Sequence, residues 1–289
     1  MLETNALTNE QKEAVIAQAL STDEGRTALA QAMVEPIRRS LEYQAVGRKL
    51  LLIDELPQGA LARYERDVAA IAHIVSRRGA VPDQIQEGEE ILVPTFEIAA
   101  NPQVRLSEIK ARRFYIVDRA QIKAKEAIQK EEDSNIFSAL IAAADTRADQ
   151  IVTNVGTLSP ASLNTAFRFI EQHDLVATKI VMHANQYASI RVLGKDFYDE
   201  ATTREILTSG LFGHLWTADI HVSSRMDADT VLVVASPDCV GAMPIRQDIT
   251  VLPADDPKKL RLGWVIYEEI GIVIVNDYSL SKIEVTSGT

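Results

Sequence analysis

The sequence lacks most features of secreted, membrane-bound or disulfide-stabilised proteins. Cys239 is the only cysteine among its 289 residues, which excludes an internal disulfide framework and fits a reducing compartment. No window approaches the run of about 20 apolar residues that a membrane span needs, so we expect no membrane contact. The first 15 residues have neither a basic start nor an apolar core, so we expect no signal peptide.

Motifs that carry catalytic chemistry are also missing. The sequence contains no GxxxxGK[ST], GxGxxG, GxSxG, HExxH or CxxC. Its five histidines are scattered, and no cysteine or carboxylate completes a zinc set with His214 and His221. Asp227 and Asp229 lack the glycine and the further ligand of a calcium loop. We therefore expect no catalytic residues, no cofactor and no metal, and a soluble α/β enzyme is only the third of three alternative functions.

The charge is acidic and unevenly distributed. Lysine and arginine number 30 against 41 aspartates and glutamates, a net charge of −11, which argues against tight, sequence-independent binding of nucleic acid. No lysine lies between Lys49 and Lys110, although this stretch contains five arginines, Arg63, Arg66, Arg77, Arg78 and Arg105. Because arginine pairs with a carboxylate through two parallel hydrogen bonds, this bias favours an interface.

The longest uninterrupted pattern is a predicted helix over residues 118–150, which contain neither glycine nor proline. Asp118 is a plausible N-cap. The helix would be roughly 45–50 Å long at 1.5 Å per residue. Its predicted apolar stripe consists of Ile122, Ile128, Phe137, Leu140, Ile141, Ala144 and Ala148. Asp133, Ser134 and Asn135 favour a kink or a break as an alternative, because their side chains compete for backbone hydrogen bonds.

The segments before this helix differ in character. Residues 1–47 predict a helical arm with weak, alanine-rich apolar faces, which needs a neighbouring surface for stability. Around its end, Arg38, Arg39, Arg48 and Lys49 form a basic cluster, either on a solvated helix or on an arm that docks on a partner subunit. Turn residues then recur between short apolar runs. They predict a long hairpin with its tip at residues 77–83 and strands at 61–65, 70–75, 90–96 and 103–117.

The segments after the helix predict an inserted domain. Residues 151–254 combine strands and helices, and Ser159-Pro160 supplies an N-cap and a first-turn proline for a helix ending near Gln172. Strands return at residues 261–268, 271–276 and 282–285. They would complete the sheet that begins before the long helix. The sequence thus predicts an α+β fold with one discontinuous domain and an inserted α/β unit.

This order of segments resembles the HK97-fold major capsid proteins of tailed bacteriophages. Three segments carry the likeness: ARRFYIVDRAQIKAKEAIQKEEDSNIFSALIAAA, ATKIVMHANQYASIRVLG and GWVIYEEIGIVIVNDYSLSKIEV. The resemblance implies an N-terminal arm (1–47), an extended hairpin or E-loop (48–102), and a P-domain built around the long spine helix (103–150 and 255–289). An α/β A-domain (151–254) would be inserted in it.

The resemblance also implies a function. Copies would assemble as hexamers and pentamers into an icosahedral shell of a virion, formed in the host cytoplasm, that encloses double-stranded DNA without sequence-specific binding. A separate scaffolding protein, a portal and a decoration protein are the implied partners. The isopeptide cross-link of some members is not expected, because the hairpin has no lysine. An encapsulin-like compartment that holds cargo proteins shares this fold and is the second alternative.

Contacts between subunits are the candidate functional sites. We expect Arg77 and Arg78 at the hairpin tip to pair with acids on the spine helix of a neighbouring copy, and Arg38 and Arg39 are further candidates in the arm. The candidate acids are Glu126, Glu131, Glu132 and Asp133.

Reversing both charges at the hairpin tip tests this hypothesis. The double variant Arg77→Glu/Arg78→Glu is expected to abolish particles, because like charges would then face each other, while the subunit stays soluble and folded. Electron microscopy and circular dichroism of the purified variant measure the two properties. Full-size shells of the variant would refute the pairing.

Overall fold

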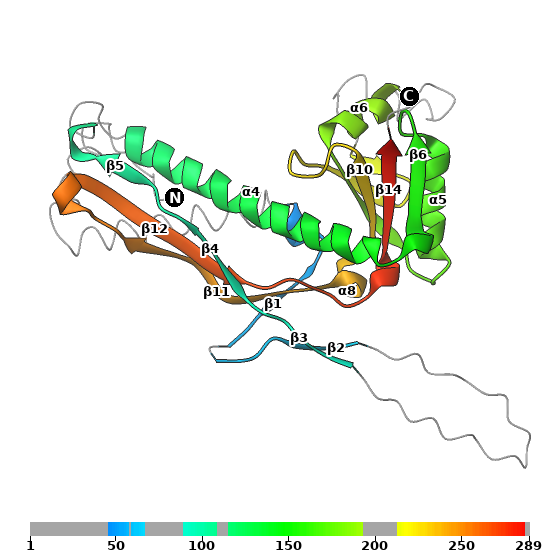
Figure 1. Ribbon diagram of the computed structural model, residues 1–289, viewed down its shortest axis with the longest axis horizontal. Helices are drawn as coiled ribbons and strands as arrows, with labels where there is room; N and C mark the ends of the chain where they lie inside the picture. Colours follow the sequence, from blue (N-terminus) through cyan, green and yellow to red (C-terminus); the bar gives the residue numbers. More distant parts are fainter. Residues whose placement is uncertain (1–45, 58, 67–88, 109–114, 193–212, 287–289) are drawn as a thin grey trace, which may run out of the picture. The chain divides into compact units, whose positions relative to one another are not determined.

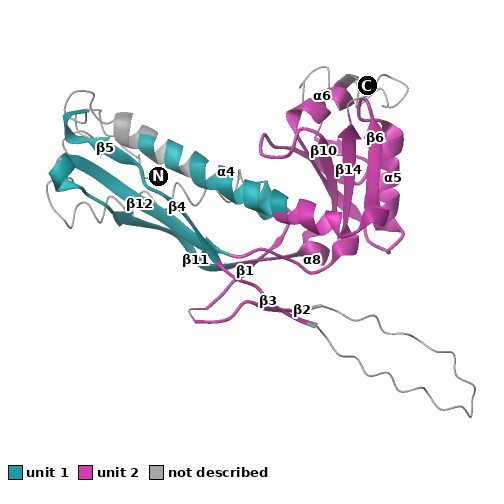
Figure 2. Ribbon diagram, viewed as in Figure 1, with its two compact units in different colours: residues 1–49, 96–138, 245–270 teal, residues 50–95, 139–244, 271–289 magenta. Residues whose placement is uncertain are grey.

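The computed structural model describes most of the chain in two compact units (Figures 1 and 2). The described residues are 46–57, 59–66, 89–108, 115–192 and 213–286. The first unit comprises residues 1–49, 96–138 and 245–270, and the second comprises residues 50–95, 139–244 and 271–289. The helix α4 (Tyr115–Asp145) and the strand β11 (Gly241–Pro253) contribute residues to both.

The predicted long helix is confirmed, with different ends. α4 begins at Tyr115, so Asp118 lies inside the helix and is not its N-cap. It is continuous through Asp133, Ser134 and Asn135, as predicted, so the alternative of a break into two helices is wrong. The carboxylate of Asp133 accepts hydrogen bonds from the amides of residues 46 and 47. It therefore does not compete for the helix's own backbone groups, which is why the helix tolerates it.

The buried face of α4 is wider than predicted. Ile128, Phe137, Leu140 and Ala144 are buried as expected, whereas Ala148 is exposed, in the short helix η2 (Ala148–Gln150) beyond the end of α4. A second row at four-residue steps consists of Ala124, Ile128, Glu132 and Ile136, all buried. A glutamate therefore occupies a core position of this helix.

In the first unit, an antiparallel sheet lies against α4 (Figure 1). Its central strand β12 (Arg261–Ile270) pairs with β11 on one side and with β4 (Phe96–Ala100) and β5 (Gln103–Arg105) on the other. Alternate residues of β12 form the buried row, which consists of Trp264, Ile266, Glu268 and Ile270. β11 also pairs with β1 (Leu52–Glu55), which belongs to the second unit.

Two predicted strands differ from the structure. The run at 90–96 is divided into β3 (Glu89–Leu92) and β4, because Pro94 between them has no amide to donate. The run at 103–117 is a strand only to Arg105, and residues 106–108 are already helical. β4 pairs with β12, so it belongs with the spine helix rather than with the hairpin region 48–102 to which we assigned it.

The second unit contains a mixed sheet with the order β6-β14-β10-β7-β9-β8. Its strands are β6 (Ile151–Val155), β14 (Leu280–Thr286), β10 (Thr230–Ala235), β7 (Ala177–Met182), β9 (Ala218–Val222) and β8 (His214–Leu215). The C-terminal strand β14 lies between β6 and β10. Assigning all of 255–289 to the same domain as 103–150 was therefore wrong, because β14 completes the inserted α/β sheet instead.

Helices complete this unit, and α5 lies where the sequence predicted a helix. α5 (Pro160–Glu171) packs against β14, β6 and β10, and α6 (Ala184–Val192) follows β7. The N-cap prediction is confirmed, since Ser159 Oγ accepts a hydrogen bond from the amide of Ser162 at 3.2 Å and Pro160 is the first helical residue. Two short helices, α8 (Pro237–Val240) and η4 (Asp277–Ser279), connect strands.

The base of the hairpin lies in the same unit. β2 (Arg63–Arg66) pairs antiparallel with β3, and four buried residues near their ends form a small core, Ala62, Val93, Ala242 and Val273. Val273 belongs to β13 (Val273–Ile274), which pairs with the first residues of β11. The hairpin therefore begins and ends on a packed core, which it needs because a hairpin without a core of its own is only marginally stable. The predicted tip at 77–83 and strand at 70–75 lie outside the described residues.

Ion pairs fix the C-terminal end of α4 in the second unit. Asp145 is the last helical residue, where a negative charge opposes the helix dipole. Lys282 of β14 compensates, because its Nζ lies 2.6 Å from Asp145 Oδ1 and 2.8 Å from Glu284 Oε1. Just beyond the helix, Arg147 pairs with Asp277 at 2.9 Å and stacks over the ring of Tyr278. Together these contacts hold the end of α4 on the mixed sheet of the second unit.

Candidate functional site

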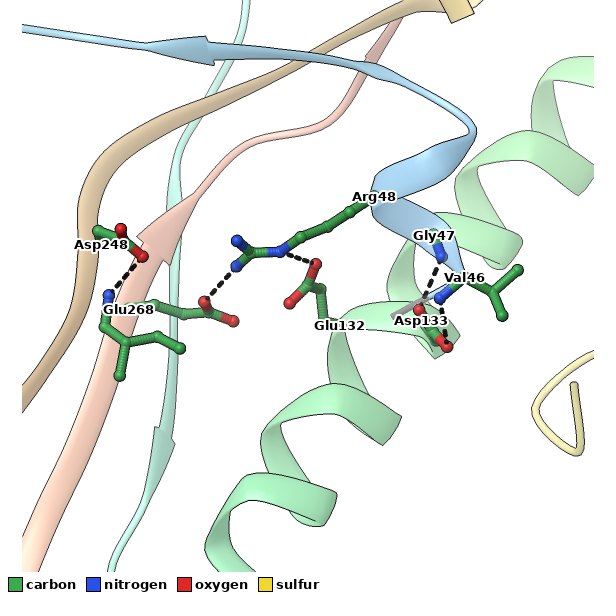
Figure 3. Close-up of polar contacts among 8 residues, drawn as sticks. Val46, Gly47, Arg48, Glu132, Asp133, Asp248 and Glu268 are labelled. Carbon is green, nitrogen blue, oxygen red and sulfur yellow. Dashed lines mark hydrogen bonds and ion pairs between the residues drawn. The ribbon is translucent and has the colours of Figure 1, made fainter. Parts of the chain in front are cut away.

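A buried ion cluster lies in the first unit, between the spine helix and the sheet (Figure 3). Arg48, in the short helix η1 (Gly47–Lys49), donates from Nε to Glu132 Oε1 at 2.6 Å and from Nη2 to Glu268 Oε2 at 3.0 Å. The Arg48 side chain is 5% exposed, and both glutamate side chains are 0% exposed. One guanidinium thus joins the helix α4, the strand β12 and the segment of residues 46–49.

Backbone contacts strengthen the same junction. Asp133 accepts hydrogen bonds from the amides of Gly47, at 2.9 Å, and Val46, at 3.4 Å. Gly47 also packs directly on the helix, since a Cβ at this position would lie only 2.5 Å from Ile136 Cδ1. We call this set the arm clasp, and it consists of Val46, Gly47, Arg48, Glu132, Asp133 and Glu268.

Burial perturbs every charge in the arm clasp. Desolvation raises the pKa of Glu132, and desolvation together with the charge of Glu132 raises the pKa of Glu268 to about 8. Desolvation opposes the charge on Arg48, but attraction by Glu132 and Glu268 outweighs it, so the Arg48 pKa is also raised. Because two buried carboxylates share one cation, the surroundings favour protonation of one of the two glutamates.

An open hollow of about 400 Å³ adjoins the clasp in the same unit. One wall is β4 and the other is the middle of α4. Its lining is mostly apolar with two acids, and it consists of Phe96, Glu97, Ile98, Ala99, Ala100, Ala127, Ile128, Glu131 and Asn135. This is a surface on which an apolar segment with a positive charge would fit.

The structure separates the four acids that we predicted as contacts between subunits. Glu126 and Glu131 are exposed, and Glu126 lies 3.8 Å from Lys130. Glu132 and Asp133 are buried and bound by residues of the same chain, so proposing them as partners of another subunit was wrong. The four arginines of that proposal, Arg38, Arg39, Arg77 and Arg78, lie outside the described residues.

Sequence reasoning also missed two members of the cluster. Arg48 was grouped with a basic cluster on a solvated helix or a docking arm, but it is buried against two acids. Glu268 was not considered at all. A signal existed for each glutamate, because Glu132 stands four residues from both Ile128 and Ile136, and Glu268 shares the inward register of Trp264, Ile266 and Ile270. A charged residue in an apolar row indicates a buried partner.

Within the described part of the chain, no group of three or more histidine, cysteine or acidic side chains is arranged to hold a metal ion. The helices of that part are all too short or too polar to cross a membrane.

Removing the cation of the arm clasp should destabilise the fold. Arg48→Met leaves two buried carboxyl groups without a positive partner, which typically costs about 3–5 kcal/mol. Urea unfolding at pH 7 measures the loss. The matched control is Arg246→Met, because Arg246 pairs with Glu269 at 2.8 Å where the two side chains are 32% and 22% exposed, so its loss should be smaller than that of Arg48→Met. Equal urea midpoints for Arg48→Met and the unmodified protein would contradict the prediction.

Structural similarity extends over most of the chain, although no family model and no curated protein sequence matches it. A structure from Microbacterium phage Oxtober96 superposes with a TM-score of 0.63 at 13% identity, covering 84% of this chain and 91% of that one. The capsid structure of the cyanophage P-SCSP1u gives 0.61 at 12% identity, covering 84% and 89%. A virus-like particle from Pyrococcus furiosus gives 0.54 at 17% identity, covering 86% and 98%.

These similarities confirm the fold that the order of segments predicted. The chain has the fold of phage capsid proteins.

Proposed function

We propose that the chain is a major capsid protein whose copies assemble into the icosahedral shell of a bacteriophage. The observation that carries the proposal is the match to the cyanophage capsid structure over 84% of the chain and 89% of that structure. A match of this extent includes both compact units rather than one common motif. The proposed location of the protein is therefore the virion, after assembly in the host cytoplasm.

The finer features of the proposal follow the predicted resemblance. Copies form hexamers and pentamers, assisted by a separate scaffolding protein and a portal, and a decoration protein is a further partner. The shell encloses double-stranded DNA without reading its sequence. The net charge of −11 supports this, since acidic walls repel DNA at short range and the repulsion is screened beyond roughly 10 Å at 0.1 M salt. The protein acts as a building block and has no enzymatic role.

An encapsulin-like compartment is the second candidate. The virus-like particle from Pyrococcus furiosus favours it, because the superposition covers 98% of that chain. Its TM-score of 0.54 is lower than the 0.61 of the cyanophage capsid, so the phage shell remains the preferred function. A soluble α/β enzyme, the third alternative, has no observation among the described residues in its favour.

The hollow beside β4 supports a specific contact between neighbouring copies. Glu131 lines it together with apolar residues of β4 and α4, whereas Glu126 stands five residues earlier, about 140° around the helix. We therefore narrow the proposed partners of Arg77 and Arg78 to Glu131. Apolar residues of the same hairpin would cover the exposed Phe96, and the arginines would reach Glu131 at the wall of the hollow.

Electron microscopy of the purified full-length protein, coexpressed with its scaffolding protein where needed, tests the function. Closed shells of uniform size are expected. A single species of 31.9 kDa on size exclusion, with no particles under any condition, would refute both shell functions and favour the enzyme. Particles isolated from infected cells distinguish the other two, because packaged DNA supports the phage capsid and packaged enzyme without DNA supports the compartment.

A charge exchange tests the narrowed contact. Adding Glu131→Arg to the Arg77→Glu/Arg78→Glu variant should restore shells, because attraction across the interface returns with opposite sign. The matched control adds Glu126→Arg instead, and it should fail to restore them. Particle yield measured by sedimentation compares the two. Equal rescue by both changes, or rescue by neither, would overturn the assignment to Glu131.

A further inference from the structure

The charges of the arm clasp do not balance. Four carboxyl groups approach one guanidinium, from Glu132 and Asp133 on α4, Asp248 on β11 and Glu268 on β12. From β4, the residue opposite Glu268 is the apolar Ile98. Glu269, which pairs with Arg246, belongs to the other register of β12, since successive side chains of a strand alternate between faces.

Two of the four acids have partners besides Arg48. Asp133 accepts from the amides of Val46 and Gly47, and Asp248 Oδ1 accepts from the amide of Ile249 at 2.8 Å. Glu132 and Glu268 are different. Each uses one oxygen to bind Arg48, and the second oxygen of each, Glu132 Oε2 and Glu268 Oε1, is buried without a hydrogen-bond partner among the described residues.

One cation balances one buried carboxylate, so a second ionised glutamate in the same dry place is unfavourable. A proton on one of the two unpartnered carboxylate oxygens removes the excess negative charge. It also turns that oxygen from a hydrogen-bond acceptor into a hydrogen-bond donor. The site is therefore built to hold a proton when it is closed. If residues 46–49 leave α4, both glutamates become accessible to water and lose the proton at an ordinary pKa.

We propose that the Glu132–Glu268 pair is a proton-controlled latch, which holds the segment after the N-terminal arm on the spine helix when it is protonated and loosens when the proton leaves. Its ligand is a proton, and its mechanical element is the 46–49 segment with Arg48 at its centre. The latch acts within one chain, so it stands or fails independently of the proposed shell.

The direction of the effect follows from linkage. The pKa of Glu268 is about 8 in the closed state, because burial and the charge of Glu132 raise it from its ordinary value of 4.5. Between these two values the closed state binds a proton that the open state does not. Opening therefore becomes up to about tenfold easier per pH unit from pH 5 to pH 8, and it levels off above that range. Acid tightens the latch and neutral to mildly alkaline pH loosens it.

Limited trypsin digestion of the full-length protein measures the latch, because trypsin cleaves after Arg48 only when this buried side chain is released. Mass spectrometry quantifies cleavage after Arg48 at each pH between 6 and 9. The comparison is with Glu268→Gln, whose neutral amide can still accept from Arg48 and mimics the protonated acid. Dividing the two rates at the same pH cancels the pH dependence of trypsin itself.

The cleavage rate of the unmodified protein relative to Glu268→Gln should rise by up to about tenfold per pH unit between pH 6 and 8 and then level off. Glu132→Gln is a second variant. Like Glu268→Gln, it should be cleaved after Arg48 with little dependence of opening on pH, since Arg48 then balances the one remaining buried carboxylate. Glu269→Gln, one residue away on the other register, is the control and should behave like the unmodified protein. A flat ratio, or an identical pH dependence in Glu269→Gln and both buried variants, would overturn the proposal.

Discussion

The junction of the first unit depends on one buried guanidinium. Arg48 binds carboxylates that lie 84 and 220 residues away in the sequence, and it does so where neither acid is exposed to water. Three segments that are far apart in the sequence therefore have to come together before each of these charges has its partner. Because an unpaired buried charge is costly, partial assemblies of this junction are much less stable than the complete one.

A buried ion cluster is rarely the most stabilising solution, since apolar residues of similar size often stabilise a core as well or better. The advantage of the ion cluster is that its hydrogen bonds are directional. A leucine at position 48 could pack at many angles, whereas a guanidinium with two defined acceptors fixes both the position and the orientation of its segment. In a protein that we propose to assemble with many identical copies, a fixed departure point for the N-terminal segment has structural value.

The spine helix combines several roles through its faces. One row of side chains buries Ile128, Glu132 and Ile136, and the neighbouring Asp133 caps backbone amides of another segment. The exposed Glu131 lines the hollow beside β4. Residues that are adjacent in the sequence thus serve the core, the clasp and the outer surface, because each step of one residue turns the helix by about 100°. This explains how a run of consecutive acids could look uniform in the sequence and yet divide into two classes in the structure.

The sequence by itself determined the local elements and their order. The long helix and the capped helix that begins at Pro160 both depend on propensities and caps within a few residues, and both were predicted. That order was sufficient to predict the capsid fold. Tertiary structure alone decided that β14 lies between β6 and β10, that β4 joins the sheet of the spine helix, and that Arg48 is buried with Glu132 and Glu268. These pairings join residues that are far apart in the chain. A local sequence pattern cannot specify a distant partner, because the pairing depends on which buried charges and which strand edges still lack a partner in the folded protein.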